Sequence, residues 1–296
     1  MPLRIAAAQY PLDRVADWDA YARKLAAWVN DAAGRGARLL VFPEYGALEL
    51  AALTAVENHA DVAAVYAALQ ERVPHFLDLH RELAVRHGVY ILAGSLPVRQ
   101  PDGRYRNRAH FFAPSGAHGH QDKLLLTRFE LAQGIMQPGE HGTVFDTAFG
   151  AVGVCICYDS EFPLIARAQV EAGARLLLVP SCTDGMAGYQ RVHIACRARA
   201  LENQCIVVQS PTVGAVDWMP VVDENVGAAG VYAPPDRYFP DDGILACGNL
   251  NEPCWVLADV DLRQVERVRA QGQVGNHADW TDSQRAMPIQ RQPLAQ

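Results

Sequence analysis

The amino-acid sequence predicts an α/β protein in which strands and helices alternate along one continuous domain. Short apolar runs recur throughout the 296 residues, and many are separated by segments with helical periodicity. Several of these runs are apolar at every position, which is typical of strands that are covered on both faces. No change in composition and no long linker divides the chain, so we expect a single layered core around a large mixed sheet system.

The predicted strands are short runs of apolar residues that end at glycine, proline or polar residues. In chain order they are Ile5–Gln9, Leu39–Phe42, Val89–Gly94, Ala109–Phe112, Val152–Cys157, Leu176–Pro180, Ile206–Ser210, Ala229–Tyr232 and Trp255–Val260. Between the fourth and fifth of these runs, His118-Gly119-His120 is expected to form a turn.

Helices are predicted where apolar residues recur every three or four positions. One such stripe begins at Trp18 and stops at Gly34. The stretch 62–87 stops at Gly88, and Pro74 is placed to begin a second helix within it. Three further helices are expected at 162–173, 188–203 and 262–270.

The domain is expected to span residues 1–280. The remaining residues, 281–296, are rich in proline, glutamine and arginine, and they are expected to form a C-terminal arm or a disordered tail. A chain of this length can bury a substantial core.

Composition excludes several classes of protein. Half of the residues are hydrophobic and a fifth are charged, which argues against disorder, collagen and coiled coils. The formal net charge is −7 with no basic block, so we expect no nucleic-acid partner. The longest stretch without Asp, Glu, Lys or Arg is 203–216, and there is no signal-peptide pattern, so no membrane segment is expected. Seven cysteines, an odd number, lie mostly in apolar runs and predict free thiols and a cytoplasmic location.

The most informative segment is 153–163, where an apolar strand reaches Cys157 and Pro163 begins a helix soon afterwards. This strand–turn–helix arrangement exposes a nucleophile at the edge of a sheet. Backbone N–H groups and a helix N-terminus would favour the thiolate, and the Tyr158 N–H is placed to donate to an oxyanion. Packing is the alternative for any cysteine in an apolar strand, and it is expected for the other six. Cys155 and Cys157 are too close in sequence for the usual zinc spacing.

Two further ionisable residues lie beside apolar runs. Glu44 follows a predicted strand and Pro43, while Lys123 precedes an apolar triplet and Glu130 follows that triplet. Alone, Glu44 is typical of a helix cap or loop, and Lys123 with Glu130 is typical of a surface charge pair. The order of Glu44, Lys123 and Cys157 along the chain changes this interpretation.

These three segments together resemble the nitrilase superfamily of carbon–nitrogen hydrolases, in its amidase-like branch. The matching motifs are Phe42-Pro43-Glu44, Asp122-Lys123 and Cys157-Tyr158-Asp159, with separations of 79 and 34 residues between the three reactive positions. The strand at 5–9 and the segments 178–181, 197–203 and 258–262 agree as well, so the resemblance covers about residues 3–280.

The resemblance implies a four-layer α-β-β-α sandwich whose protomers pack helix face to helix face, and hence a homodimer or a higher homo-oligomer. It also implies that Cys157 is the nucleophile, Glu44 the general base and Lys123 the oxyanion-stabilising cation. Many members have a second glutamate after the lysine, for which Glu130 is the candidate, ahead of Glu140 and Glu161. Such chemistry needs no metal and no organic cofactor.

The expected reaction is cleavage of the C–N bond in a small non-peptide carboxamide through a thioester, with release of ammonia or an amine. Hydrolysis of a nitrile or an N-carbamoyl compound at the same site remains an alternative, and a catalytically silent interaction protein is a third.

Residues at the end of the strand after Cys157 are expected to face the substrate, and these are Ser181, Thr183 and Asp184. Asp184 would meet a cationic substrate group or remain a solvated loop carboxylate. Glu161 stands where many members have arginine, so no subgroup's substrate is carried over.

Overall fold

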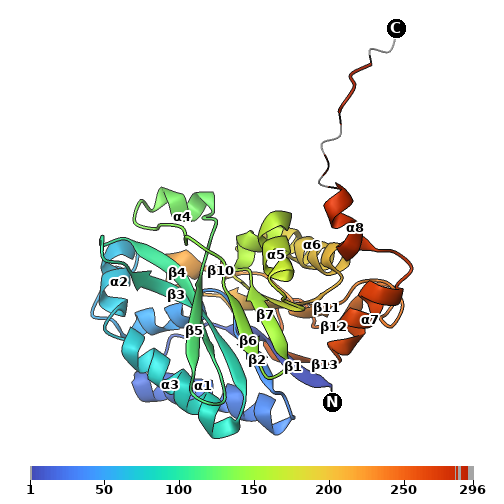
Figure 1. Ribbon diagram of the computed structural model, residues 1–296. Helices are drawn as coiled ribbons and strands as arrows, with labels where there is room; N and C mark the ends of the chain where they lie inside the picture. The colour runs from blue at the N-terminus through green and yellow to red at the C-terminus, as the bar shows by residue number, and fades with distance from the viewer. Residues whose placement is uncertain (1, 284, 286–287, 293–296) are drawn as a thin grey trace.

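Two β-sheets form the centre of the fold, and helices cover their outer faces (Figure 1). The computed structural model describes residues 2–283, 285 and 288–292. The strands are β1 (Leu3–Pro11), β2 (Leu39–Val41), β3 (Tyr90–Arg99), β4 (Tyr105–Phe112), β5 (His118–Asp122), β6 (Val144–Thr147), β7 (Gly150–Val154), β8 (Leu176–Ser181), β9 (Ile206–Ala215), β10 (Glu224–Asn225), β11 (Gly230–Tyr232), β12 (Ile244–Cys247) and β13 (Cys254–Val260). The α-helices are α1 (Trp18–Gly34), α2 (Val62–Leu69), α3 (Val73–His87), α4 (Arg128–Ala132), α5 (Pro163–Glu171), α6 (Met186–Asn203), α7 (Arg263–Gln271) and α8 (Asn276–Ser283). The 3₁₀ helices in the described part of the chain are η1 (Gly46–Leu53), η2 (Cys157–Glu161) and η3 (Pro220–Val222).

The first sheet has the strand order β5-β4-β3-β2-β1-β13, and the second has the order β6-β7-β8-β9-β11-β12. Parallel pairing joins β1 to β9 through two residue pairs, Tyr10 with Thr212 and Pro11 with Val213, which links the two sheets. Helices α1 and α3 lie on one outer side of the molecule and α5 and α6 on the other (Figure 1). This is the four-layer α-β-β-α sandwich that the family resemblance implies.

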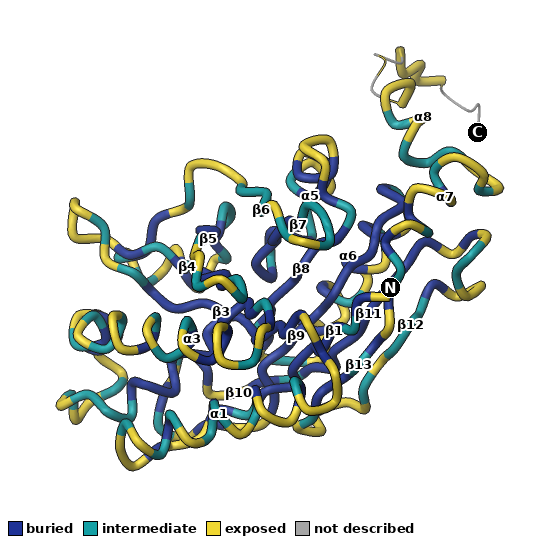
Figure 2. The backbone as a smooth tube through the Cα atoms, turned by 60° about the horizontal axis from the view of Figure 1, so that its bottom comes forward, coloured by how far each residue is buried: buried dark blue, intermediate teal, exposed yellow. Residues whose placement is uncertain are grey.

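Burial on both faces explains why the central strands are apolar at every position. In β1, Ile5 and Ala7 belong to the core cluster shared with the second sheet. Ala6 and Ala8, which point the other way, belong to the cluster shared with α1 and α3. Because successive side chains of a strand point to opposite faces, both sets are excluded from water only when both faces are covered. Figure 2 shows the buried strands inside and the exposed turns of the helices outside.

The longer helices follow the predicted periodicity closely. In α1 the buried residues are Tyr21, Leu25, Val29 and Ala32, and the side chain of Asp17 caps its start by accepting from the Ala20 N–H at 2.7 Å. The stretch 62–87 divides into α2 and α3, with Pro74 in the first turn of α3, as predicted.

The prediction of a turn at His118-Gly119-His120 is wrong, because these residues belong to β5 and pair with β4. The side chains explain why a segment with few apolar residues forms a strand. His118 stacks on Phe112 with 4.6 Å between ring centroids, and its Nε2 lies 2.8 Å from Nδ1 of the buried His110. These side-chain contacts between β4 and β5 stabilise the pairing, and they leave no periodic signal in the sequence.

The expected boundary between residues 280 and 281 falls inside α8, which continues to Ser283. This helix is attached to the domain, since the guanidinium of Arg167 lies 5.0 Å from the ring of Trp280 and donates to the carbonyl oxygen of His277. Residues 288–292 are described and form neither helix nor strand. Parts of the expected arm, residues 284, 286–287 and 293–296, lie outside the described residues.

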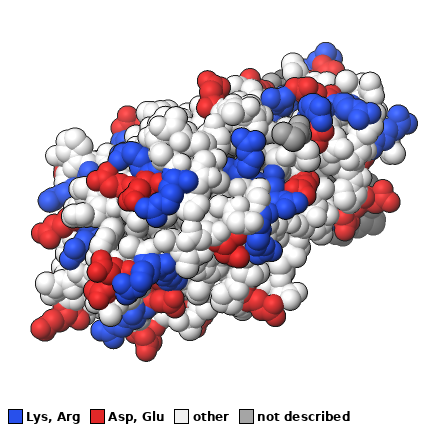
Figure 3. Space-filling view, turned by 90° about the horizontal axis from the view of Figure 1, so that it is seen from below, with Lys and Arg blue, Asp and Glu red and all other residues white. Residues whose placement is uncertain are grey.

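Acidic and basic side chains are interspersed on the face that Figure 3 shows, rather than gathered in one large field of a single sign. Ion pairs about one helical turn apart join Arg35, which follows α1, to Asp31 and Arg81 to Asp78 on α3. Among the described residues, no helix has the length and apolar character that crossing a membrane requires.

Candidate active site

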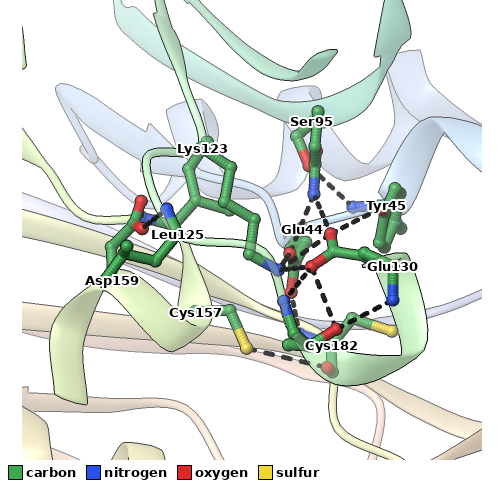
Figure 4. Close-up of polar contacts among 12 residues, drawn as sticks. Glu44, Tyr45, Ser95, Lys123, Leu125, Glu130, Cys157, Asp159 and Cys182 are labelled. Atoms are coloured by element: carbon green, nitrogen blue, oxygen red, sulfur yellow. Dashed lines mark hydrogen bonds and ion pairs between the residues drawn. The ribbon is translucent and has the colours of Figure 1, made fainter. Parts of the chain in front are cut away.

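Glu44, Lys123, Glu130 and Cys157 meet at one cavity of about 600 Å³, although they lie on four separate segments of the chain. Glu44 follows β2, Lys123 follows β5, Glu130 lies on α4 and Cys157 begins η2. Figure 4 shows their side chains turned toward one another. The structure therefore brings together all four residues that the sequence assigns to catalysis.

The loop that carries Glu44 is held against β3 by a close backbone approach. Gly94 has a φ of +78°, and a Cβ atom at this position would lie 2.1 Å from the carbonyl oxygen of Pro43, so the approach requires glycine. The next residue, Ser95, accepts a hydrogen bond at its Oγ from the Tyr45 N–H at 3.0 Å. These contacts fix the backbone on both sides of Glu44.

Lys123 is a fully buried cation between two carboxylates. Its Nζ lies 2.8 Å from Oε1 of Glu44, and 2.9 and 2.8 Å from the two carboxylate oxygens of Glu130. Burial opposes ionisation of the amine, but the charges of Glu44 and Glu130 outweigh it and raise the pKa of Lys123 well above its ordinary value. Lys123 therefore remains protonated and supplies a fixed positive charge to the lining of the cavity.

Glu130 orients Lys123 and is itself held by several donors. It accepts from the N–H and hydroxyl of Thr127, which caps α4, and from the phenol of Tyr45 at 2.8 Å. Burial opposes its ionisation, but Lys123 and these donors outweigh burial and lower the pKa of Glu130. Glu140 and Glu161, the other candidates for this position, pair instead with Arg106 and Arg191.

Glu44 differs from Glu130 in its protonation behaviour. Burial raises the pKa of Glu44, the nearby charge of Glu130 adds to the rise, and the attraction of Lys123 opposes it. Its Oε2 accepts from the backbone N–H of Cys182 at 3.0 Å, and its Oε1 accepts from the side-chain amide of Asn107 at 2.9 Å. A carboxylate with a raised pKa is suited to accepting and returning a proton.

Cys157 lies in the turn that the sequence predicts, between β7 and α5, and has a left-handed φ of +47°. Its Sγ lies 3.7 Å from the carbonyl oxygen of Cys182. Burial of the site opposes the thiolate that the sequence favours. Burial and the charge of Glu44 outweigh Lys123 and raise the pKa of Cys157 well above its ordinary value, so the thiol is neutral and needs a base.

Tyr158, Thr183 and Asp184 line the cavity, as expected, together with Phe129 and Arg191. Ser181 is not among the residues that line it. The Ser181 side chain is buried, and its hydroxyl lies 3.5 Å from the carbonyl oxygen of Ser210 on the neighbouring strand. We therefore do not assign Ser181 to the site.

The sequence does not indicate Tyr45, Asn107 and Cys182 as site residues. Each of them contacts Glu44 or Glu130, and the contacting residues lie 23 to 138 positions apart in the chain. The sequence predicts a packing role for Cys182, yet Cys182 lines the cavity and its backbone contacts both Glu44 and Cys157. The position of Tyr45 directly after Glu44 is the one signal that the sequence offers. In the described part of the chain, no cluster of three or more His, Cys, Asp and Glu side chains could hold a metal ion.

Comparison with known proteins gives the family of this chain. The model of the carbon-nitrogen hydrolase family matches residues 4–269. The chain belongs to this family. Its fold and its family agree with the resemblance found in the sequence.

Two curated relatives are similar over most of the chain. The probable hydrolase YhcX of Bacillus subtilis is 33% identical over 273 residues, which are 92% of this chain and 52% of that protein. The chain thus spans about half the length of that relative. The omega-amidase NIT2-B of Xenopus laevis is 26% identical over 258 residues, which are 82% of this chain and 83% of that protein.

A solved structure supports the fold. Nit3 of Saccharomyces cerevisiae, a member of branch 10 of the nitrilase superfamily, has a TM-score of 0.74 and 21% sequence identity, covering 91% of this chain and 93% of that one. At this level of identity the likeness concerns the fold alone.

Proposed function

We propose that this carbon-nitrogen hydrolase is a cysteine-dependent amidase that hydrolyses small non-peptide carboxamides through a thioester on Cys157. The observation that carries the proposal is the buried cluster in which Lys123 bonds both Glu44 and Glu130 beside the neutral thiol of Cys157. A thiol nucleophile, a carboxylate that can accept and return a proton, and a fixed cation together suit amide cleavage. The omega-amidase among the relatives supports an amide as substrate.

In the acylation step, the thiol of Cys157 gives its proton to Glu44 while its sulfur bonds to the amide carbon. The carbonyl oxygen becomes negative and is stabilised by Lys123 and the backbone N–H of Tyr158. As the C–N bond breaks, Glu44 returns the proton to the leaving nitrogen, and ammonia or an amine departs. The product on the protein is a thioester at Cys157.

In the deacylation step, water attacks the thioester carbon and gives a proton to Glu44. The C–S bond then breaks, Glu44 returns the proton to the sulfur, and the carboxylic acid leaves. One carboxylate thus acts in both half-reactions. Glu130, which accepts from Thr127 and Tyr45 and keeps a lowered pKa, holds Lys123 in place without exchanging a proton.

The test is an ammonia-release assay with three sets of compounds: small aliphatic amides, the corresponding nitriles, and N-carbamoyl amines. We expect turnover of amides above the other two sets. If only nitriles or only N-carbamoyl compounds were turned over, an amide substrate would be ruled out. The nucleophilic role of Cys157 would still stand. No turnover in any set, with folded protein, would overturn the proposal and favour a non-catalytic role.

We further propose that the chain folds as a single domain and forms a homodimer or a higher oligomer through α5 and α6. We also propose that it works in a reducing compartment such as the cytoplasm. Apolar side chains exposed on these helices support the interface, among them Leu164, Ile194 and Leu201. All seven cysteines are free, which supports a reducing compartment. Light scattering after size exclusion tests the oligomer, and a single monomeric species would contradict it.

A further inference from the structure

A buried carboxylate that the proposed chemistry does not use lies between the two segments that carry the nucleophile and the cation. Asp159 is fully buried in η2, two residues after Cys157. Its Oδ1 accepts from the Leu125 N–H at 2.8 Å and its Oδ2 accepts from the Ile156 N–H at 3.2 Å. The Leu124 N–H lies 3.2 Å from both oxygens. Figure 4 shows the bond between Asp159 and Leu125 next to Lys123.

These three donors belong to the backbone immediately beside two proposed catalytic residues. Leu124 follows Lys123 directly, and Ile156 precedes Cys157 directly. A shift of either segment would move Nζ of Lys123 relative to Sγ of Cys157, and both atoms must meet the same amide group.

We propose that Asp159 is a positioning residue, and that its ionised carboxylate holds the Lys123 segment and the Cys157 turn in one fixed arrangement. This inference rests on the proposed amidase function. An ionised carboxylate has only acceptors and can accept from all three N–H groups. A protonated carboxyl carries one O–H donor, and that donor would face a backbone N–H and break part of the arrangement.

The surroundings of Asp159 place this protonation near neutral pH. Burial raises the pKa of Asp159 to about 7, against the opposing effects of Lys123 and the three backbone N–H groups. From α6, Arg199 donates to the carbonyl oxygen of Ser160 and not to the carboxylate. The nearby thiol of Cys155, like that of Cys157, has a pKa raised well above its ordinary value and stays neutral in this range.

The deciding variant is Asp159→Asn, which keeps the size of the side chain and removes the titration. Its matched control is Asp236→Asn. Asp236 is also a buried carboxylate that accepts backbone N–H groups, from Gln273 at 2.8 Å and from Arg237 at 2.6 Å, and it does not line the cavity.

We expect D159N to lower kcat by about 10- to 100-fold with little change in KM, as a displacement of reacting groups does. We also expect the fall in wild-type kcat below about pH 7 to be absent from the D159N profile. D236N should retain the wild-type kcat and profile. The proposal would be overturned by a folded D159N variant with the wild-type kcat. It would also be overturned by a folded D159N variant whose kcat is reduced and still falls below about pH 7 as in the wild type.

Hydrogen exchange on the wild-type protein decides the matter without turnover, and also where D159N does not fold. After correction for the intrinsic rate, protection of the Leu124 and Leu125 amides should rise several-fold between pH 6 and pH 8. The Gln273 amide, held by Asp236 with its lowered pKa, should show flat protection. Flat protection at Leu124 and Leu125 would overturn the positioning role, even with amidase activity present. A rise in protection without any amidase activity would overturn the proposed function instead.

Discussion

Nζ of Lys123 lies 2.8 Å from Oε1 of Glu44, and both side chains are buried although 79 residues separate them in sequence. With Glu130 on its other side, Lys123 compensates two carboxylates that the fold removes from water. Breaking a buried charge pair from one side leaves an uncompensated charge, so each member of this cluster affects stability as well as chemistry.

Lys123→Met should abolish turnover and lower the free energy of unfolding by about 3–5 kcal/mol at pH 8, as loss of one partner of a buried pair does. Without the cation, burial raises the pKa of Glu44 and Glu130, so the folded variant takes up protons as the pH falls toward 5. The difference in free energy of unfolding between the variant and the wild type should therefore shrink over this range. Urea unfolding at both pH values measures this. Lys24→Met is the control: Lys24 pairs with the buried Glu49 outside the cavity, so turnover should persist. If the variant lost the same free energy of unfolding at both pH values, Lys123 would not be the cation that compensates Glu44 and Glu130.

Glu44→Gln should lower kcat/KM by about 10²- to 10⁴-fold, the usual contribution of a general base. Both half-reactions should slow, because the same carboxylate transfers the proton in each. Rapid-quench kinetics separates the two steps. Glu49→Gln, which alters a buried glutamate bonded to Lys24 and Tyr10, should retain activity. Unchanged deacylation in E44Q would remove Glu44 from the second step.

Cys157→Ala should abolish turnover and leave the fold intact, since it removes one small Sγ atom, which lies 3.7 Å from the Cys182 carbonyl oxygen. Cys155→Ala, two residues away and also buried, is the matched control and should retain turnover. Amide hydrolysis and thermal unfolding are measured for both variants. General thiol alkylation is a poor substitute, because Cys247 is the exposed cysteine and would react by access alone.

Acid should destabilise the protein through His80, which is buried among aromatic rings beside Phe76 and Phe112. Burial lowers the pKa of His80 to about 4, against 6.5 for the free side chain. Because the unfolded chain takes up a proton at a higher pH than the folded one, the free energy of unfolding falls as the pH drops from 6.5 toward 4. The total loss is about 3 kcal/mol. Thermal or urea unfolding of the wild type and of His80→Phe across pH 4–7 measures this. An unchanged acid slope in the variant would contradict the account.

Local patterns in the sequence predict much of the fold. The apolar stripe from Trp18 to Gly34 becomes α1, and the apolar runs become the central strands of both sheets. The sequence does not predict residues whose strand pairing depends on side-chain contacts rather than on apolar periodicity. His118 joins a strand because Phe112 and His110 receive its ring, and neither contact changes the local pattern.

The same distinction holds for the site. Glu44, Lys123 and Cys157 follow or precede apolar runs, so their place at strand ends is visible in the sequence. Cys182 acts through its backbone N–H and carbonyl, which no residue type reveals. Asn107 reaches Glu44 from a strand 63 residues away, and a local pattern cannot carry that contact.

The central claim is a thioester on Cys157, and trapping that intermediate tests it most directly. Wild-type protein turning over a small amide is quenched in acid, digested at low pH and mapped by mass spectrometry, with C157A as the control. We predict the acyl mass on the peptide that contains Cys157 in the wild type and its absence in C157A. Turnover by C157A, or an acyl group on a different residue, would contradict the account.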